Sequence, residues 1–470
     1  MKPRLLILPA AIRSHVLPSL YIADLLADEY EIVYAVSNAI LVDLVTANGY
    51  QAVMTSGFRV GYNMEASFLA SKIQKLSYLR LLKAYRTDEL YWERRRELNA
   101  LIDEIRPTVI LIDLFVCTDF WVLNPRRSEC KLLFFNPMPS TYRVENWPSV
   151  AESYLTPTPL LKQGEGLKKT HFTFSVSTWR RGRGGTPRGM RSWFMQWTVT
   201  RHRQRIQQLA QALPDYPLAQ DATVTQVIAN VPELILAPLE FEFAPEIRKP
   251  NQHYLGLCMR EHRQDTELDP VFEQAWEAIL AQIQQGEKLI YCSFGTFHEG
   301  ADATLLRFVT NLLEVIRELP HVHLVCSVNK YVIETLRARK LLTDRTHFFS
   351  RVPQLQVLAE ADVFITHAGF GSIKESIYYG VPMLAYPLDP HYDQNGNALK
   401  LEYHGLGLRG AFTHERLGDL KNKLERLLEE KSFREKVRQF REVIFDEYKE
   451  EKIKGTVQSL LMNKQLEVLA

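Results

Sequence analysis

Short apolar runs alternate with longer segments of helical periodicity along most of this chain. In the N-terminal half the apolar runs lie at residues 4–8, 31–36, 108–113 and 131–135. Runs that are apolar throughout are typical of parallel strands covered by helices on both faces. The segments 18–28 and most of 65–105 have the spacing of helices. We therefore predict β-α-β units and a parallel sheet in this half.

A second series of apolar runs lies at residues 288–294, 323–326, 346–349, 362–366 and 382–386. Between the two series, residues 236–257 contain three prolines and show little helical periodicity. This segment is predicted to be a linker, with a domain boundary near residue 250. The last segment, 429–470, is predicted to be helical and is heavily charged. The pattern thus indicates an α/β protein with two doubly wound domains.

Composition agrees with this picture and excludes several classes. A length of 470 residues suits two domains, and 46% hydrophobic with 24% charged residues excludes a disordered chain. The net charge of +2 gives no overall bias toward nucleic acid or membrane. The five cysteines form no Cys-x-x-Cys pair, which favours a reduced, cytoplasmic setting. The first apolar run, broken by Pro9, indicates a strand rather than a signal peptide, and no run approaches the roughly eighteen residues that cross a bilayer.

One stretch, residues 161–205, departs from the average composition. It holds eleven Lys and Arg residues against one acidic residue, Glu165, and aromatic residues are interleaved with them. A solvated loop with a few buried aromatic residues would explain the pattern. A basic aromatic surface that contacts anionic membrane or an acidic acceptor would explain it as well. No nucleic-acid-binding motif accompanies the stretch, so we expect no nucleic-acid partner.

The segment 362–379 carries the clearest chemistry. A predicted strand runs through the glycine-rich turn 367–372 into a predicted helix. Backbone amides at the positive end of such a helix suit a diphosphate. A capping box is the alternative, because Ser372 is followed three residues later by Glu375, and such a box needs no ligand.

The residues on either side of this turn extend the pattern. The chain has Pro353-Gln354, then His367-Ala-Gly369 with Ser372 and Glu375, then Gly380-Val-Pro382, and then Asp393-Gln394 with Asn397. This block resembles the nucleotide-sugar signature of glycosyltransferase family 1, the UDP-glycosyltransferases, over about 45 residues. A weaker resemblance, in strand order and in the placement of other motifs, covers most of the chain.

The resemblance implies roles in binding a diphosphate and a ribose. His367 and Ser372, with the amides of the turn that contains Gly369 and Gly371, would hold the diphosphate. Glu375 would accept hydrogen bonds from the ribose hydroxyls, as carboxylates do in other nucleotide sites. Gly371 departs from the plant members of the family, which usually have Asn there.

The resemblance also implies contacts with the other parts of a sugar donor. Gln354 would face the edge of the base, and Asp393 and Gln394 would bind the sugar hydroxyls. Thr296 matches a family loop near the β-phosphate. Arg351 stands where plant members have an aromatic residue that stacks on uracil, so the sequence leaves the nucleotide open between uridine and others.

Two residues of the N-terminal half match the family's catalytic pair. His15 follows the first predicted strand in what we expect to be a loop, ahead of Pro18, and Asp113 ends a later strand. Histidine suits a general base because its ordinary pKa of about 6.5 lets it accept a proton near neutral pH. The resemblance implies that Asp113 orients His15 and stabilises its protonated form. The alternatives are a structural histidine and an aspartate that caps a turn.

The resemblance implies the GT-B architecture, two Rossmann-like domains that face each other across a cleft. Residues 1–250 would bind the acceptor, residues 251–445 the nucleotide sugar, and the helical segment 446–470 would pack back on the first domain. The implied reaction is inverting transfer of a hexose from a nucleoside-diphosphate sugar, with a UDP-hexose as the expected co-substrate, to a hydroxyl of a small molecule. Aromatic residues between Tyr142 and Trp197 favour a hydrophobic acceptor. We expect no cofactor and no metal.

Two other functions stay open. One is a catalytically silent homologue that binds a partner, although the presence of His15, Asp113 and the whole donor block argues against it. The other is an enzyme that glycosylates a lipid, such as a carotenoid or a sterol, at the inner face of the membrane, with the stretch 161–205 as its support. In every case the expected location is cytoplasmic.

Overall fold

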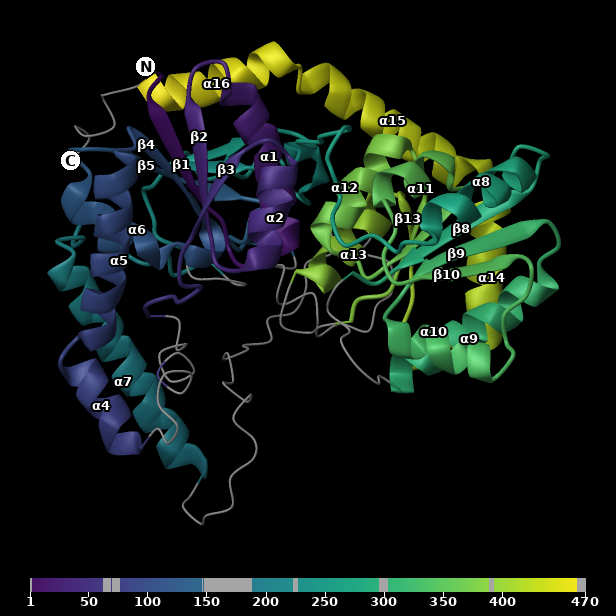
Figure 1. Ribbon diagram of the computed structural model, residues 1–470, viewed down its shortest axis with the longest axis horizontal. Helices are drawn as coiled ribbons and strands as arrows, with labels where there is room; N and C mark the ends of the chain where they lie inside the picture. Colours follow the sequence, from purple (N-terminus) through teal and green to yellow (C-terminus); the bar gives the residue numbers. More distant parts are fainter. Residues whose placement is uncertain are drawn as a thin grey trace.

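The computed structural model of the protein describes residues 2–61, 69, 77–145, 147, 188–222, 227–295, 303–388 and 393–462. Two parallel sheets organise them, one in each half of the chain (Figure 1). The first has seven strands in the order β3-β2-β1-β4-β5-β6-β7, and the second has six in the order β10-β9-β8-β11-β12-β13. Both orders are those of Rossmann-like domains, so the predicted GT-B class is confirmed.

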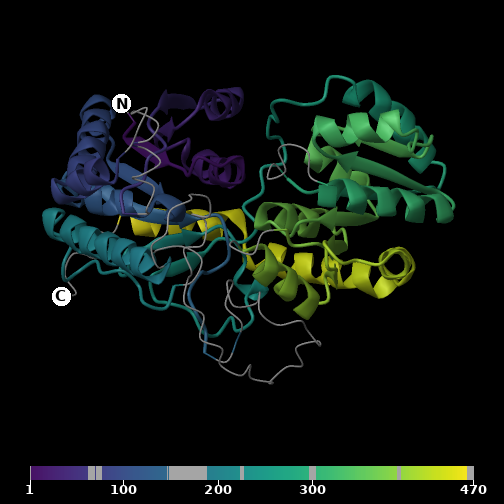
Figure 2. The same ribbon diagram turned by 90° about the horizontal axis from the view of Figure 1, so that it is seen from below.

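The first sheet consists of β1 (Arg4–Leu8), β2 (Glu31–Val36), β3 (Gln51–Met54), β4 (Val109–Asp113), β5 (Lys131–Asn136), β6 (Glu233–Ile235) and β7 (Gln252–Tyr254). Its helices are α1 (Arg13–Leu26), α2 (Ala39–Ala47), α4 (Tyr78–Arg86), α5 (Glu89–Ile105), α6 (Thr118–Leu123) and α7 (Arg188–Leu209), with short 3-10 turns at Leu114–Val116, Asn124–Arg126 and Leu239–Phe241. Figure 2 shows helices on both faces of this sheet. That explains why its central strands are apolar without alternation.

The second sheet consists of β8 (Lys288–Ser293), β9 (Val322–Ser327), β10 (Thr346–Phe349), β11 (Val363–Thr366), β12 (Met383–Ala385) and β13 (Gly407–Arg409). Its helices are α8 (Phe272–Ile283), α9 (Ala303–Glu318), α10 (Lys330–Ala338), α11 (Gln354–Glu360), α12 (Phe370–Tyr379), α13 (Gln394–Tyr403) and α14 (Leu417–Glu429). Two apolar clusters, one on each face, bury the side chains of its strands. The chain ends in α15 (Lys431–Glu447) and α16 (Glu450–Met462).

The last two helices run from the second sheet back to the first. α15 contributes Val437 and Ile444 to an apolar cluster of the second half. α16 contributes Ile453, Val457 and Leu460 to the cluster that holds β1, β2 and α1. Figure 1 shows the two helices, in yellow, spanning both halves of the molecule. Burial of one apolar face of each helix therefore ties the C-terminus to the first sheet.

The sequence located the central strands of both sheets and the edge strand β10, but it missed four short strands. β3, β6, β7 and β13 have four residues or fewer, and β7 lies inside the segment 236–257 that was predicted to be a linker. It pairs with β6 by backbone hydrogen bonds, which need no apolar run.

The predicted start of the first helix was wrong. α1 begins at Arg13, and the backbone N–H groups of His15 and Val16 both donate to the carbonyl of Ile12. Pro18, the sixth residue of α1, lies inside the helix and has no N–H to donate to the carbonyl of Ser14. His15 is therefore in the first turn of a helix rather than in a loop.

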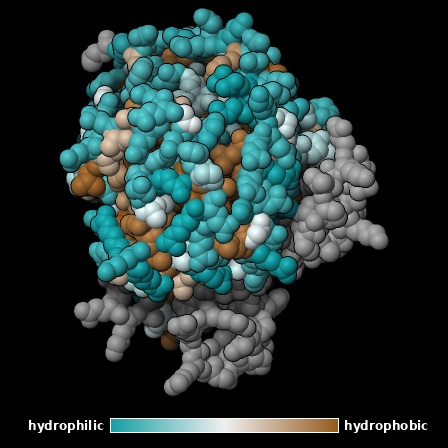
Figure 3. Space-filling view, turned by 90° about the vertical axis from the view of Figure 1, so that its right-hand side faces the viewer, coloured by the Kyte–Doolittle hydropathy of each residue, from teal (hydrophilic) through white to brown (hydrophobic). Residues whose placement is uncertain are grey.

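Within the described residues, no helix is both long and apolar enough to span a bilayer. The face of the second half shown in Figure 3 is mostly hydrophilic, with apolar residues in small scattered areas.

Candidate functional site

Each sheet reverses its strand order once, and the candidate residues lie at these two points. The reversal is between β1 and β4 in the first sheet and between β8 and β11 in the second. Loops that leave neighbouring strands at such a point turn to opposite faces of the sheet, and the crevice between them is the usual ligand site of open α/β sheets. His15 follows β1, Asp113 ends β4 and His367 follows β11.

The structure brings His15 and Asp113 together. The Nδ1 atom of His15 lies 2.8 Å from Oδ2 of Asp113, and both side chains are buried. Asp113 is fixed by the backbone, because the N–H of Ala10 donates to Oδ2 over 2.9 Å and the N–H of Phe115 donates to Oδ1 over 2.8 Å. The Phe115 ring packs on the imidazole, with 4.6 Å between ring centroids.

This arrangement assigns the tautomer of the histidine. Since a carboxylate only accepts hydrogen bonds, Nδ1 of His15 is the donor and carries the proton. Nε2 is then the basic nitrogen of the ring. A histidine held by a buried aspartate in this way is equipped to accept a proton from a hydroxyl group.

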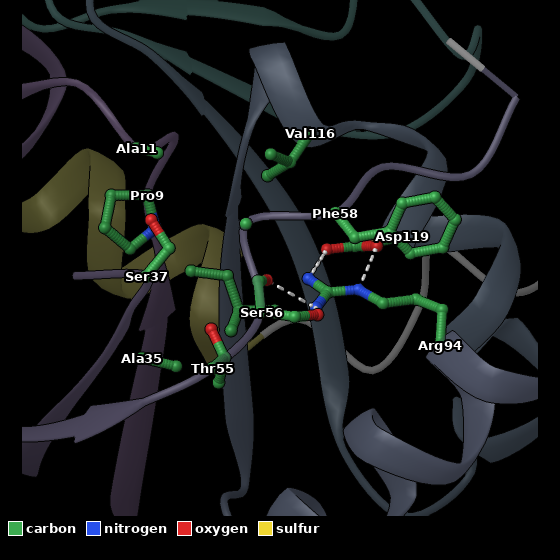
Figure 4. Close-up of a pocket in the computed structure, with 12 residues that line it drawn as sticks. Pro9, Ala11, Ala35, Ser37, Thr55, Ser56, Phe58, Arg94, Val116 and Asp119 are labelled. Carbon is green, nitrogen blue, oxygen red and sulfur yellow. Dashed lines mark hydrogen bonds and ion pairs between the residues drawn. The ribbon is translucent and has the colours of Figure 1, made fainter. Parts of the chain in front are cut away.

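A small polar pocket lies next to this pair, at the carboxyl ends of β1 and β2 (Figure 4). The guanidinium of Arg94 reaches into its wall and bonds both carboxylate oxygens of Asp119, over 3.0 and 2.6 Å. Glu97 is a second carboxylate partner at 2.7 Å, and Arg94 also donates to the carbonyl of Ser56 over 3.0 Å. Because two carboxylates bind its guanidinium, Arg94 fixes the wall of the pocket rather than offering it a cation.

His367 stands at the corresponding position of the second sheet, between two glycines. A Cβ on Gly369 would come within 2.4 Å of Nε2 of His367, and one on Gly295 within 2.9 Å of its Cε1. Both positions therefore need glycine so that the ring can fit. A Cβ on Gly371, in contrast, would meet nothing within 4 Å, so the first turn of α12 faces open space there.

Gln354, Ser372 and Glu375 come together at the start of α11 and α12. Nε2 of Gln354 donates to Oε2 of Glu375 over 2.5 Å and approaches Oγ of Ser372 at 3.4 Å. The hydroxyl of Tyr291 donates to Oε1 of Gln354 over 3.2 Å and sets the orientation of the amide. The side chain of Gln354 thus orients the carboxylate of Glu375.

The capping-box alternative for Ser372 and Glu375 is wrong. α12 begins at Phe370 with Gly369 as its N-cap, so Ser372 lies inside the helix. The carboxylate of Glu375 bonds side chains of other elements, Gln354 and Arg263.

Asp393 and its neighbours close the second half of the site. Nδ2 of Asn397 donates to Oδ2 of Asp393 over 2.7 Å and to the carbonyl of Ala368 over 3.1 Å. The Oε1 atom of Gln394 accepts from the N–H of Leu388 over 2.8 Å, which ties this side chain to the loop after β12.

The two halves of the site act on each other electrostatically. Burial raises the pKa of Asp393, whereas the hydrogen bond from Asn397 lowers it. Ion pairs also connect the two halves: Arg13, two positions before His15, pairs with Asp265, Asp265 pairs with Arg263, and Arg263 pairs with Glu375. The structure therefore brings the residues of both halves to one site.

Two of the predicted features lie outside the described residues. One is Thr296, in the loop after β8, and the other is most of the stretch 161–205, of which only the backbone from residue 188 onward and a few side chains are described. Arg351 is described, and its guanidinium lies 3.8 Å from a carboxylate oxygen of Glu267.

Sequence reasoning missed the residues that surround Glu375. Arg263 pairs with Glu375 on one side and with Asp265 on the other, and Arg13 pairs with Asp265. Arg263 and Asp265 are two positions apart, but both lie far from Arg13 and from Glu375 in the chain, and the family signature includes none of the three. Among the residues that the structure describes, no cluster of three or more His, Cys, Asp or Glu side chains is arranged to hold a metal ion.

A family model agrees with these features. The model described as "UDP-glucoronosyl and UDP-glucosyl transferase" matches residues 193–448, more than half of the chain. Among curated proteins, the oleandomycin glycosyltransferase of Streptomyces antibioticus is 34% identical over 135 residues, which cover 28% of this chain and 29% of that protein. The first curated relatives are thus matched over only about a third of their length or less.

Solved structures show the same fold over nearly the whole chain. The glycosyltransferase of kitacinnamycin superposes with a TM-score of 0.64 at 18% identity and covers 98% of this chain and 100% of its own. A UDP-glucosyltransferase from Polygonum tinctorium capable of glucosylating indoxyl gives a TM-score of 0.62 at 15% identity and covers 99% of both chains.

Proposed function

Because the chain belongs to the UDP-glucuronosyl and UDP-glucosyl transferase family, we propose that it transfers a hexose from a nucleoside-diphosphate sugar to a hydroxyl of a hydrophobic small molecule, with inversion at the anomeric carbon. The observation that carries the proposal is the buried pair of His15 and Asp113, whose helix α1 is joined to Glu375 of the donor block by the ion pairs of Arg13, Asp265 and Arg263. A base on one side and a charged, hydrogen-bonding half-site on the other are what sugar transfer needs.

The first sheet supplies the base. Nε2 of His15 takes the proton of the acceptor hydroxyl, and the oxygen attacks the anomeric carbon of the sugar. The proton then resides on the imidazole, where the buried carboxylate of Asp113 stabilises the positive charge.

The second sheet supplies the donor site. The bond between the anomeric carbon and the β-phosphate oxygen breaks as the new bond forms, and the diphosphate leaves with the electron pair. The amides at the start of α12, around Gly369 and Gly371, together with His367, Ser372 and Thr296, would stabilise its charge. The scheme as proposed uses no metal ion.

The remaining donor contacts follow the same assignment. Glu375 would bind the ribose diol, oriented by Gln354, which would also present its backbone to the base. Asp393 and Gln394 would bind the sugar hydroxyls. The expected co-substrate is a UDP-hexose, and Arg351 at the position of the plant aromatic residue keeps dTDP and GDP sugars as alternatives to test.

The names of similar proteins support a small-molecule acceptor. One relative is named for oleandomycin, and one structural neighbour is described as capable of glucosylating indoxyl. We propose the division of labour expected from the sequence, with the acceptor bound by residues 1–250 and the donor by residues 251–445. Contact of the stretch 161–205 with anionic membrane, and a lipid acceptor with it, stay predictions that liposome pelleting at low salt would test.

Calorimetric titration of the purified protein with UDP, dTDP and GDP, without added metal, tests the proposal. Saturable binding of one nucleotide identifies the donor class and directs an acceptor screen with the matching sugars. If none binds with or without a hydroxylated aromatic acceptor, the donor assignment fails and a silent homologue becomes the better description.

A further inference from the structure

The ribose-binding candidate Glu375 already has a charged partner from the segment that joins the two sheets. Nη1 of Arg263 bonds Oε1 of Glu375, and only 8% and 7% of the two side chains are exposed. Arg263 lies in the segment 260–267, between the last strand of the first sheet and the first helix of the second, which we call the linker arm. Burying an ion pair costs desolvation free energy unless further hydrogen bonds satisfy both charged groups. The other partners of Arg263 therefore matter for the position of the pair.

The other partners lead to the first domain. The Nε atom of Arg263 lies 3.3 Å from Oδ1 of Asp265, and the same oxygen is 3.1 Å from Nη2 of Arg13. The second nitrogen of Arg13, Nη1, donates to Oγ1 of Thr266 over 2.9 Å. Arg13 is the first residue of α1 and lies two positions before His15. A chain of alternating charges therefore connects the turn that carries His15 with Glu375.

The linker arm is also anchored to the first domain by contacts that do not involve Arg13, Asp265 or Arg263. Arg260 bonds the side chain of Asn48 over 2.9 Å and Asp24 over 2.8 Å, and Asn48 also exchanges two bonds with the backbone of Gln264. Residues of the first domain thus fix the position of the arm that carries Arg263, and Arg263 in turn binds Glu375.

The pairing leaves Glu375 able to bind a diol. A carboxylate offers about four lone-pair positions, and here Arg263 takes one on Oε1 while Gln354 takes one on Oε2. One position on each oxygen stays available, which suits two neighbouring hydroxyls. Arg263 therefore sets the direction of the carboxylate without displacing a ligand.

We propose that Arg263 is a positioning residue for the nucleotide donor, and that the sequence of contacts Glu375, Arg263, Asp265 and Arg13 couples donor binding to the turn that carries His15. The inference rests on the proposed function, because it takes Glu375 as the ribose ligand. Loss of Arg263 would leave Glu375 misdirected, and loss of Arg13 would loosen Arg263 through Asp265.

The test compares two arginines of the same linker arm. With UDP as the calorimetric probe, or whichever nucleotide the wild type binds, Arg263→Gln is expected to weaken binding by about 10- to 100-fold, the worth of a buried bond to a charged group. Arg263→Lys should restore part of the affinity. Arg260→Gln is the matched comparison, since Arg260 anchors the arm without touching Glu375, and it should weaken binding much less than Arg263→Gln does; an equal loss would overturn the specific role of Arg263.

Coupling to the first domain has its own readout. Arg13 does not contact Glu375, yet Arg13→Gln should weaken binding of the same nucleotide about threefold. This effect should vanish when Arg263→Gln is already present. Additive effects would overturn the coupling. A wild type that binds nucleotide no better than Arg263→Gln would overturn the positioning role alone, whereas a wild type that binds none would overturn the proposed function together with it.

A folding defect is separated by a measurement that needs no nucleotide. Urea denaturation of Arg13→Gln, Glu375→Gln and the double variant measures whether two residues that do not touch affect stability jointly. The proposal expects a midpoint shift in the double variant that differs from the sum of the single shifts. If the shift of the double variant equals the sum of the two single shifts, the proposed series of contacts is overturned, whatever the binding results.

Discussion

His15 and Asp113 are 98 residues apart in the chain, yet Nδ1 of one and Oδ2 of the other are separated by 2.8 Å. The pairing of β1 with β4 explains this contact. Leu8 lies beside Ile112 in the parallel register, so the residues that follow both strands emerge at the same edge. The contact between His15 and Asp113 is thus a consequence of strand order, and the catalytic role proposed for the two residues can be tested separately from the donor site.

His15→Ala is expected to lower the turnover number by about 100- to 10,000-fold, the usual contribution of a general base, with little change in nucleotide affinity. Steady-state assay with a sugar donor and calorimetry with the nucleotide give the two numbers. His414→Ala, which alters an exposed histidine, is the control. Loss of nucleotide binding together with activity would make His15 a structural residue.

Glu375→Ala is expected to weaken nucleotide binding by at least tenfold, because the ribose loses its acceptor and Arg263 is left buried without its partner. Calorimetry measures the affinity and urea denaturation the accompanying loss of stability. Glu375→Gln keeps the size of the side chain and one acceptor, so it should fall between the alanine variant and the wild type. Unchanged affinity in both variants would refute the ribose role.

Gly369 and Gly371 offer a matched pair of substitutions. Gly369→Ala would push a methyl group into the ring of His367, so both stability and nucleotide affinity should fall. Gly371→Ala meets no protein atom within 4 Å and gains helix propensity, so its stability should equal or exceed that of the wild type. Thermal denaturation of the two variants checks the difference, and equal losses would contradict the role given to the His367 ring.

Much of the site could be predicted from the sequence because it follows strands that are apolar throughout. The turn after β11 and the end of β4 adjoin such strands, so His367 and Asp113 were placed correctly along their elements. The short strands β6 and β7 were not recognised, because they lie in a proline-containing region and are held by pairing with neighbours, whereas the equally short β12 lies in the apolar run 382–386. An apolar run in the sequence indicates a buried strand, whereas a strand that is held mainly by pairing with its neighbours leaves no such local pattern.

The partners of Glu375 show a second limit of the sequence. Arg263 lies 112 positions before Glu375, and Asp265 lies 252 positions after Arg13. An arginine in a polar linker looks like a solvated side chain until the two domains are placed together. The resemblance supplied the role of Glu375 without the charges that orient it.

Glu233 on β6 gives a prediction for stability against pH. Its carboxyl is fully buried, and burial raises its pKa to about 7, although hydrogen bonds from Asn136 and Gln252 act in the opposite sense. The folded protein therefore holds a proton that the unfolded chain releases above its ordinary pKa of 4.5. Stability from this group is greatest at low pH and is lost as the pH rises from about 4.5 to 7.

Glu233→Gln removes that dependence because the amide does not titrate. The variant should gain stability relative to the wild type between pH 5 and pH 8, by up to about 3 kcal/mol from the size of the pKa shift.

Buried histidines oppose the trend, since burial lowers the pKa values of His202, His347 and His404 to about 4 and destabilises the fold at acid pH. Their contribution is the same in both proteins and cancels in the difference of urea midpoints. Glu273→Gln alters an exposed carboxyl and is the control, so its stability difference from the wild type should not change with pH. If the difference for Glu233→Gln does not change with pH either, the carboxyl of Glu233 does not hold the proton.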